Sequence, residues 1–238
     1  MVSSQQDFPR EPEKAAYVRR MFAAIAGRYD LMNRLMTGGQ DRAWRRNVVE
    51  VASLPPGGWL LDVATGTGDI AYEALRQVPD AHVVGVDFTL EMMRIGRRKR
   101  RQGYVAFVGG DACRLPFPDD TFDVVTSGFG MRNVVDIRAA FAEQRRVARP
   151  GGRVVCLEIT PPAKGLWGAL YRLYFFHLVP FIGGWITGRP DAYAYLPRST
   201  ERFPAPESLK AIMEEVGLRH VRYRRLMMGT VAIHLGIK

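Results

Sequence analysis

The stretch LDVATGTGD at 61–69 decides how this chain folds. The apolar run at 59–63 predicts a short buried strand, and the pattern at 69–78 predicts a helix. Gly66 and Gly68 stand in the turn between them, where a glycine lets the backbone approach a ligand without a Cβ clash. A strand, a glycine turn and a helix in this order are typical of the ligand-binding end of an open α/β sheet. The letters GTGDIA also fit the dinucleotide fingerprint, so NAD and a purely structural turn both stay open.

Strands and helices alternate along most of the remaining chain. Apolar runs predict further strands at 82–87, 104–111, 122–128, 153–159, 218–226 and 231–237. Helical spacing predicts helices at 69–78, from near residue 90, at 139–149 and at 207–217. The expected fold is therefore an α/β protein with a Rossmann-like, mostly parallel sheet covered by helices on both faces. The last two runs are expected to form a terminal hairpin.

Two helical regions stand outside this alternation. Helical spacing predicts N-terminal helices at 14–27 and 43–52, within a region of about 14–52. The apolar, aromatic stretch at 167–188 predicts a helical insert of about 165–200 on the substrate side. An arginine, a histidine, a proline and a glycine pair interrupt this stretch, which argues against a membrane span and favours a cavity-lining insert. We expect residues 1–238 to form a single domain.

Composition excludes several classes of protein. Of the 238 residues 47% are hydrophobic, which excludes a disordered chain. The two cysteines have no metal-ligand or disulfide spacing, so we expect no metal and a reduced, cytoplasmic protein. The charge of +10 is concentrated at 94–103, where no aromatic residues alternate with the arginines. A solvated helix face is therefore favoured over nucleic-acid binding. The functional alternative is that the arginines attract the protein to an anionic membrane. The protein would then be peripheral at the inner face of that membrane.

Two acidic residues narrow the ligand. Asp87 ends the second strand 19 residues beyond Gly68, where a carboxylate can accept both ribose hydroxyls of an adenosine, or cap the next helix. Asp62 precedes the glycines and would repel a pyrophosphate, whereas it would attract a ligand with an amino group and a sulfonium. This favours S-adenosylmethionine over NAD. The alternative is that Asp62 only ties down the loop.

Two sets of segments carry a family resemblance. The stretches DVATGTGD, VVGVD, GDACRLPFPDDTFD and RVARPGGRVV resemble class I S-adenosylmethionine-dependent methyltransferases, whose seven-stranded sheet has an antiparallel last strand. The segments at 28–44, 127–134, 146–160 and 191–204 are similar to those of quinone-biosynthesis C-methyltransferases acting on demethylmenaquinol and its ubiquinone counterpart. Departures from the usual pattern are Ala64, Gly128 and Thr160.

The resemblance implies a set of cofactor contacts. Gly66, Thr67 and Gly68 would contact the methionine part, Asp87 the ribose, and Asp111 with Ala112 the adenine. Read from the residues alone, Asp111 is either an acceptor for the adenine amino group or a turn aspartate bonded to its own backbone.

A methyltransferase of this kind must hold a nucleophilic ring carbon in line with the sulfonium methyl. Arg132 is our candidate for stabilising the quinol oxyanion and Asn133 for orienting the same oxygen, although Arg132 can equally pair with a carboxylate that fixes its loop. His177 is a tentative general base, with a structural role as the alternative. The polar groups expected to close the pocket as part of a lid are Tyr29, Asp30, Asn33 and Tyr195.

The expected function is methylation of demethylmenaquinol to menaquinol. The alternatives are a ubiquinone-pathway benzoquinol and another small-molecule substrate of a methyltransferase. The expected partners are a prenylated quinol and the membrane surface, with no nucleic acid. The oligomeric state is left open by the sequence.

Overall fold

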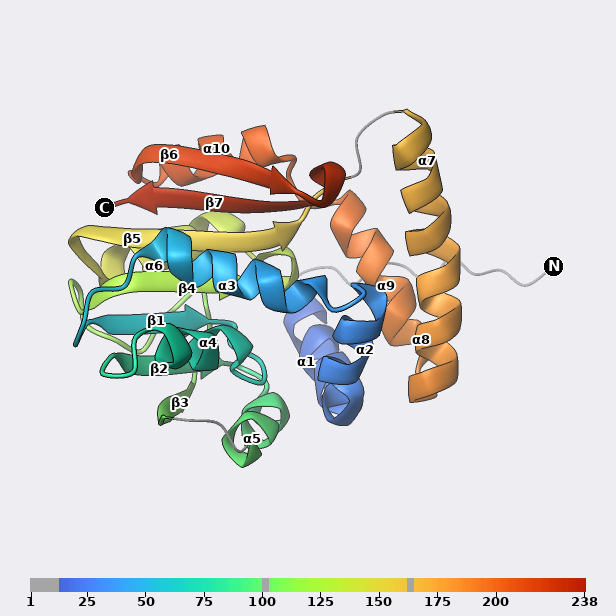
Figure 1. The fold of residues 1–238 in the computed structure, drawn as a ribbon, viewed down its shortest axis with the longest axis horizontal. Helices are drawn as coiled ribbons and strands as arrows, with labels where there is room; N and C mark the ends of the chain where they lie inside the picture. The colour runs from blue at the N-terminus through green and yellow to red at the C-terminus, as the bar shows by residue number, and fades with distance from the viewer. Residues whose placement is uncertain (1–12, 100–102, 162–164) are drawn as a thin grey trace.

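Seven strands form one sheet in the order β3-β2-β1-β4-β5-β7-β6 in the computed structural model, which describes residues 13–99, 103–161 and 165–238 (Figure 1). The strands are β1 (Trp59–Val63), β2 (His82–Asp87), β3 (Val105–Gly109), β4 (Phe122–Gly128), β5 (Ala148–Ile159), β6 (Arg219–Leu226) and β7 (Val231–Ile237). The five neighbouring strands β3, β2, β1, β4 and β5 are parallel, and β7 is antiparallel to both of its neighbours, β5 and β6. The predicted α/β class and the antiparallel last strand are therefore confirmed.

The central strands are buried because helices cover both faces of the sheet. Leu60 belongs to the hydrophobic core on one face and Leu61 to the core on the other, as side-chain alternation along a strand requires. The first core is closed by α3 (Gln40–Ala52), α4 (Asp69–Gln77) and α5 (Leu90–Arg98). The second is closed by α6 (Ile137–Val147) and α10 (Pro206–Glu215). This arrangement explains why β1 reads as a continuous apolar run.

Strand order reverses between β1 and β4, and the crevice beyond their carboxyl ends is the usual ligand site of such a sheet. The turn after β1 enters this crevice. Gly66 and Gly68 adopt φ of 56° and 79° there, in the left-handed region that glycine tolerates. Ala64 also has a positive φ of 54°, which a side chain makes less favourable.

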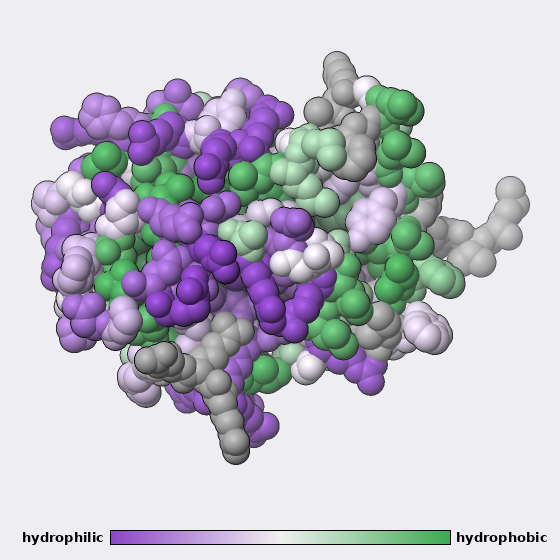
Figure 2. Space-filling view, in the orientation of Figure 1, coloured by the Kyte–Doolittle hydropathy of each residue, from purple (hydrophilic) through white to green (hydrophobic). Residues whose placement is uncertain are grey.

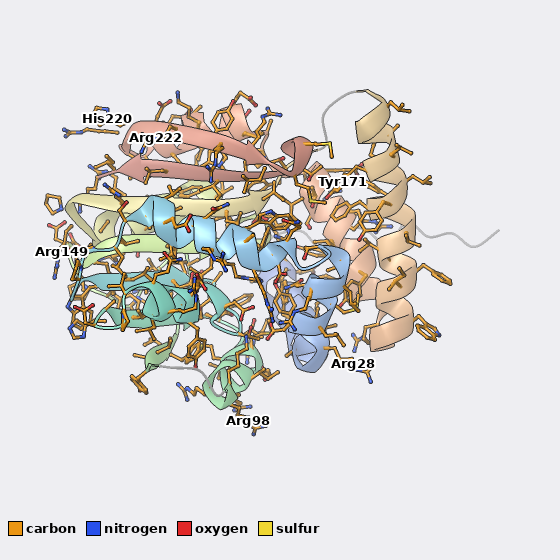
Figure 3. The ribbon with its side chains drawn as sticks, in the orientation of Figure 1. Arg28, Arg98, Arg149, Tyr171, His220 and Arg222 are labelled. Carbon is orange, nitrogen blue, oxygen red and sulfur yellow. The ribbon has the colours of Figure 1, made fainter. Side chains whose placement is uncertain are left out.

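A separate helical layer lies beyond the carboxyl edge of the sheet, at the right of Figure 1. It consists of α1 (Glu13–Ile25), η1 (Ala26–Arg28), α2 (Tyr29–Met36), α7 (Leu166–Leu173), η3 (Tyr174–Leu178), α8 (Val179–Thr187) and α9 (Pro190–Glu201). Its own core contains Val18, Met32, Phe175 and Tyr193, together with Tyr171, which lies on the inner side of α7 (Figure 3). We call this layer the lid.

The insert is less interrupted than its sequence indicates. The elements α7, η3 and α8 follow one another without a gap and form one rod (Figure 1). Pro180 would clash with the preceding turn of a regular α-helix, but it follows directly on the wider π turn of η3, which accommodates the ring. Among the residues described here, no helix is both long and apolar enough to cross a membrane.

Two local predictions were also wrong. Residues 29–36 form α2, although no helix was expected between the two predicted N-terminal ones. Strand β5 begins at Ala148, which pairs with Phe122 before a bulge, so the strand starts earlier and α6 ends earlier than the apolar pattern indicates.

Candidate active site

Three cavities open at the carboxyl edge of the sheet. The first, which we call the sheet cavity, has a volume of about 890 Å³ and extends from β1, β2 and β4 towards α1. Its lining includes Gly66, Asp87, Asp111, Ala112 and Asn133. The structure thus brings together five residues that the sequence singles out.

Asp87 is buried and serves two purposes in this cavity. Its Oδ2 accepts the Gly66 N–H at 2.8 Å, and its Oδ1 accepts the Thr89 N–H at 2.7 Å. Burial raises the pKa of Asp87, and the hydrogen bonds from Thr89 and Gly66 oppose that shift. The carboxylate therefore fixes the glycine loop and still has acceptor positions for a ligand.

Asp111 follows β3 and forms a local turn. Its Oδ1 accepts the Cys113 N–H at 2.9 Å, as a turn aspartate does. Asp111 and Ala112 both line the sheet cavity. The turn therefore places this pair at the cavity wall.

The second, the loop cavity, has a volume of about 360 Å³ and lies over the turn after β1. Asp62 lines it and accepts the hydroxyls of Thr65 at 2.6 Å and Thr126 at 2.9 Å. Burial raises the pKa of Asp62 to about 6. Asp62 thus accepts hydrogen bonds from side-chain hydroxyls and not from the backbone amides of the loop. Its carboxylate faces a small polar cavity.

Thr67 also lines the loop cavity, but its hydroxyl is already engaged. It donates to Asp30 Oδ1 at 2.7 Å and accepts from Lys99 Nζ at 2.7 Å. Lys99 is itself 2.7 Å from carboxylate oxygens of Asp30 and Asp69. These four residues, which we call the Lys99 cluster, connect the lid to the glycine loop. The sequence did not single out Lys99, because it stands in an arginine run that predicts a solvated helix face.

Gly68 has a packing role. None of the three cavities that the described residues form is lined by it. A Cβ at this position would lie 2.8 Å from Phe107 Cζ. Gly68 therefore allows the close approach of the loop to β3.

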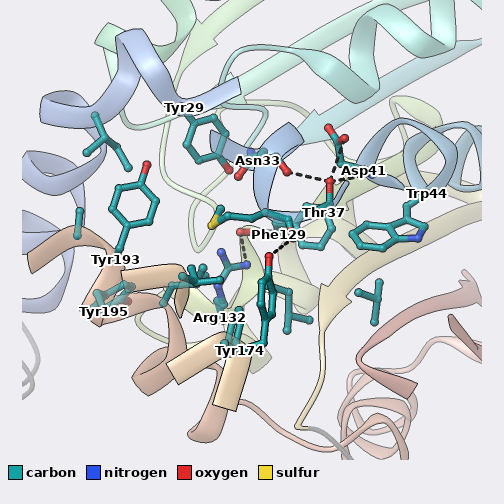
Figure 4. A pocket seen from close by; sticks show the side chains of 18 of the residues that line it. Tyr29, Asn33, Thr37, Asp41, Trp44, Phe129, Arg132, Tyr174, Tyr193 and Tyr195 are labelled. Carbon is teal, nitrogen blue, oxygen red and sulfur yellow. Dashed lines mark hydrogen bonds between the residues drawn. The ribbon is translucent and has the colours of Figure 1, made fainter. Parts of the chain in front are cut away.

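The third, the lid cavity, has a volume of about 940 Å³ and a largely apolar lining from α1, α2, the insert and α9 (Figure 4). The residues lining it include Ile25, Asn33, Met36, Trp44, Arg132, Ile159, Tyr171, Phe175, Val179, Tyr193 and Tyr195. A partly open apolar cavity with few polar groups suits a lipophilic ring compound.

Arg132 lines the lid cavity, as does Arg45, whose guanidinium is paired with Asp41 and Asp69. Arg132 lies in η2 (Met131–Asn133), where its Nη1 is 2.5 Å from Glu158 Oε1 and donates to the Phe129 carbonyl at 2.7 Å. Its Nε is buried and has no hydrogen-bond partner among the described residues. Arg132 thus pairs with a carboxylate that fixes its loop and keeps a donor for a ligand. Both interpretations of this residue are compatible with the geometry.

Asn133 lies on the sheet-cavity side of the same turn. It lines the sheet cavity, whereas Arg132 lines the lid cavity. Its Nδ2 donates to the Phe129 carbonyl at 3.4 Å, and its buried Oδ1 has no partner in the described part of the chain. Arg132 and Asn133 therefore lie on either side of Phe129 and line different cavities. His177 belongs to η3, but its side chain lies outside the described residues.

The three cavities converge. Tyr29 and Phe129 line all three, and Phe22 lines both the sheet and the lid cavity. Burial raises the pKa of Tyr29, and a hydrogen bond with Asn33 opposes the shift. Within the described residues, no three His, Cys, Asp or Glu side chains are grouped to hold a metal ion.

The fold of this chain is shared with solved methyltransferases. One from Thermotoga maritima, described as an S-adenosylmethionine-dependent methyltransferase and possible histamine N-methyltransferase, matches with a TM-score of 0.66 and 18% identity, over 92% of this chain and 98% of that one. The likeness concerns the fold.

The family follows from the sequence of the whole chain. The sequence model of the ubiE/COQ5 methyltransferase family matches residues 10–238, and the chain belongs to this family. It is 50% identical to the demethylmenaquinone methyltransferase of Thermus thermophilus over 218 residues, 91% of this chain and 99% of that protein. It is 48% identical to the one from Roseiflexus castenholzii over 230 residues, 97% of each chain. The family resemblance seen in the sequence is confirmed.

Proposed function

We propose that this protein transfers the methyl group of S-adenosylmethionine to a ring carbon of demethylmenaquinol and releases menaquinol. The observation that carries the proposal is the convergence of the sheet, loop and lid cavities at Tyr29 and Phe129. A donor in the sheet and loop cavities and a quinol ring in the lid cavity would meet there. The family and the named relatives agree with this assignment.

The sheet and loop cavities contain polar groups that fit the proposed cofactor. Asp87 and the unpartnered Asn133 Oδ1 provide acceptors in the sheet cavity for hydroxyl and amino groups. The Asp62 carboxylate faces the loop cavity, where a positively charged amino group would lower the cost of its burial. Asp111 and Ala112 would flank the adenine, and Gly66 and Thr67 the methionine part. When bound, the cofactor supplies an activated methyl group on its sulfonium.

The lid cavity supports the second half of the reaction. A quinol ring carbon becomes nucleophilic when the neighbouring hydroxyl loses its proton, because the negative charge is then shared with that carbon. Arg132 Nε would donate to this oxygen and stabilise the charge. The Glu158 pair holds the guanidinium in place. The apolar lining excludes water, and His177 stays our candidate for accepting the proton.

The outer face of the lid carries an exposed apolar stripe. It runs along α7, η3 and α8 and consists of Leu166, Leu170, Leu173, Leu178, Phe181 and Trp185. The π turn takes up one extra residue, so Leu173 and Leu178 behave like an i, i+4 pair and the stripe stays on one side. Phe181 is 76% and Trp185 85% exposed. Hydrophobic surface gathers over α7 and α8 at the right of Figure 2.

We propose that this stripe rests on an anionic membrane at its inner, cytoplasmic face. Exposed basic side chains of the lid support this, since Arg172 lies on α7 within the stripe and Arg19, Arg20 and Arg34 are exposed on α1 and α2. Aromatic and aliphatic side chains with nearby arginines are typical of helices that lie in the membrane interface. A prenylated quinol could then pass from the bilayer into the lid cavity. Of the arginine run at 94–103, Lys99 is bonded to Asp30 and Asp69 within the protein, and residues 100–102 lie outside the described part of the chain.

The reaction is tested with labelled S-adenosylmethionine and two reduced substrates, demethylmenaquinone and a demethoxy-type benzoquinone precursor. We expect methylated menaquinol from the first. Product from the benzoquinol alone would reassign the protein to the ubiquinone pathway, and product from neither would reject the proposal.

Membrane contact is tested by flotation with vesicles that contain anionic phospholipid. Phe181→Ser with Trp185→Ser should abolish flotation. Tyr104→Ser is the matched control, because Tyr104 is 82% exposed on the sheet body, away from the stripe. Equal flotation of all three proteins would contradict the membrane proposal.

A further inference from the structure

A second polar side chain of the lid cavity lacks a partner, and it belongs to the lid itself. Tyr193 lies in α9, is 4% exposed and lines the lid cavity (Figure 4). Its hydroxyl is buried without a hydrogen-bond partner among the described residues. A buried hydroxyl left unpaired costs free energy, so such a group in a ligand cavity indicates a ligand that pairs with it.

The neighbouring tyrosines show the contrast. The Tyr174 hydroxyl donates to the Met36 carbonyl at 2.7 Å, and Tyr29 is hydrogen-bonded to Asn33. These two side chains are satisfied by the protein itself. Tyr193 lines the same cavity with its hydroxyl unpaired.

The ring of Tyr193 is held in a defined position. A Cβ at Gly183 of α8 would lie 2.3 Å from Tyr193 Cγ and 2.5 Å from Cδ1. The ring therefore packs directly on the α8 backbone, which only a glycine at position 183 permits. Because its base is fixed on α8, its hydroxyl has a fixed place at the cavity wall.

A hydroquinone presents two oxygens at opposite ends of its ring, and both need partners when the ring is buried. Arg132 reaches the cavity from η2, next to the reaction centre, and Tyr193 reaches it from α9 (Figure 4). We infer that Tyr193 hydrogen-bonds the quinol oxygen opposite the one that Arg132 stabilises. This inference rests on the proposed function, and it makes Tyr193 the residue that selects para-diols over mono-phenols. Burial raises the pKa of Tyr193 to about 12, which keeps the hydroxyl protonated and able to donate.

The quinol oxygen that Tyr193 contacts carries less of the developing negative charge than the oxygen beside the reacting carbon. The Tyr193 hydrogen bond should therefore be equally strong in the ground state and the transition state. Loss of such a contact raises KM and leaves kcat nearly unchanged. Tyr193→Phe removes only the hydroxyl and keeps the packing on Gly183. We expect KM for demethylmenaquinol to rise about tenfold, the usual effect of one hydrogen bond to a buried group.

The test compares two substrates. The first is demethylmenaquinol, and the second is a prenylated mono-naphthol that keeps the hydroxyl beside the reacting carbon and lacks the opposite one. Tyr193→Phe should impair the first and leave KM for the second as in the wild type. Equal impairment on both substrates, or none on either, would overturn the role of Tyr193. Absence of wild-type product from both would instead reject the proposed function.

Gly183→Ala provides an independent check. The added methyl group must displace the Tyr193 ring, so this variant should also raise KM for the diol. In the double variant with Tyr193→Phe, Gly183→Ala should add little to the change in selectivity between the diol and the mono-naphthol, because the Tyr193 hydroxyl is already absent. A full additional loss of selectivity would show that Gly183 does not act through Tyr193.

Discussion

Asp62 links cofactor binding to pH in a way that can be measured. Burial raises its pKa from 3.8 to about 6, and its side chain lies at the carboxyl end of β1 with 1% exposure. A shift of two units corresponds to about 3 kcal/mol in favour of the neutral carboxyl group. The free protein therefore holds a proton on Asp62 below about pH 6.

The sign follows from linkage. The pKa of Asp62 is higher in the folded than in the unfolded chain, so its contribution to stability is greatest below pH 3.8 and declines as pH rises to about 6. A cofactor that brings a positively charged amino group and a sulfonium needs the carboxylate instead. Binding must then expel the proton below about pH 6. The apparent Kd should rise about tenfold for each pH unit below 6 and stay level above it.

Isothermal titration calorimetry of S-adenosylmethionine between pH 5 and pH 8 measures this dependence. Asp62→Asn should bind more weakly at pH 8 and lose the change below pH 6. Asp111→Asn is the matched control, because it alters the sheet cavity and should keep the wild-type pH profile. A wild-type Kd that is equal at pH 5 and pH 7 would refute the reasoning, as would an Asp62→Asn profile that follows the wild type.

Three further substitutions test other parts of the site. Lys99→Met removes the cation between the carboxylates of Asp30 and Asp69, so the free energy of unfolding measured by urea titration should fall by about 2–3 kcal/mol. An unchanged midpoint would mean that the Lys99 cluster does not contribute to stability. Gly130→Ala places a Cβ 2.5 Å from that of Ala64 and should cost about 1–3 kcal/mol, which Ala64→Gly should largely restore; equal loss in the double variant would locate the strain elsewhere. Arg132→Lys cannot replace the planar guanidinium, so kcat should fall about 100-fold while calorimetry shows unchanged cofactor binding; unchanged kcat would remove its proposed role.

The sheet could be predicted because its signals are local. Leu60 and Leu61 face opposite cores, so successive residues of β1 must be apolar up to Asp62, which faces the loop cavity. The glycine loop and Asp87 follow from the same rule, since a ligand crevice lies where the strand order reverses. The sequence shows less clearly which residues of the loop line the cavities. Gly68 resembles Gly66 in the sequence, yet it packs on Phe107 away from the cavities.

The lid was harder to predict because its helices do not face one ordinary core. In α2 the apolar Leu31 and Leu35 are exposed, so the usual periodic signal is misleading. The insert contains a proline that normally interrupts a helix, and only the preceding π turn makes a continuous rod possible. Lys99 follows the exposed Arg97 and Arg98 in the sequence, and only the tertiary fold turns it toward two carboxylates.

The position of α2 joins the two halves of the proposed reaction. Asp30 connects this helix to Thr67 and Lys99 at the glycine loop, and the preceding residue, Tyr29, lines all three cavities. One turn of helix is thus bonded to the glycine loop and at the same time lines the sheet, loop and lid cavities. A change that detaches Asp30 must also displace Tyr29, since the two residues are adjacent. We therefore expect Lys99→Met to lower turnover as well as stability, because Lys99 binds both Asp30, the neighbour of Tyr29, and Thr67 of the glycine loop.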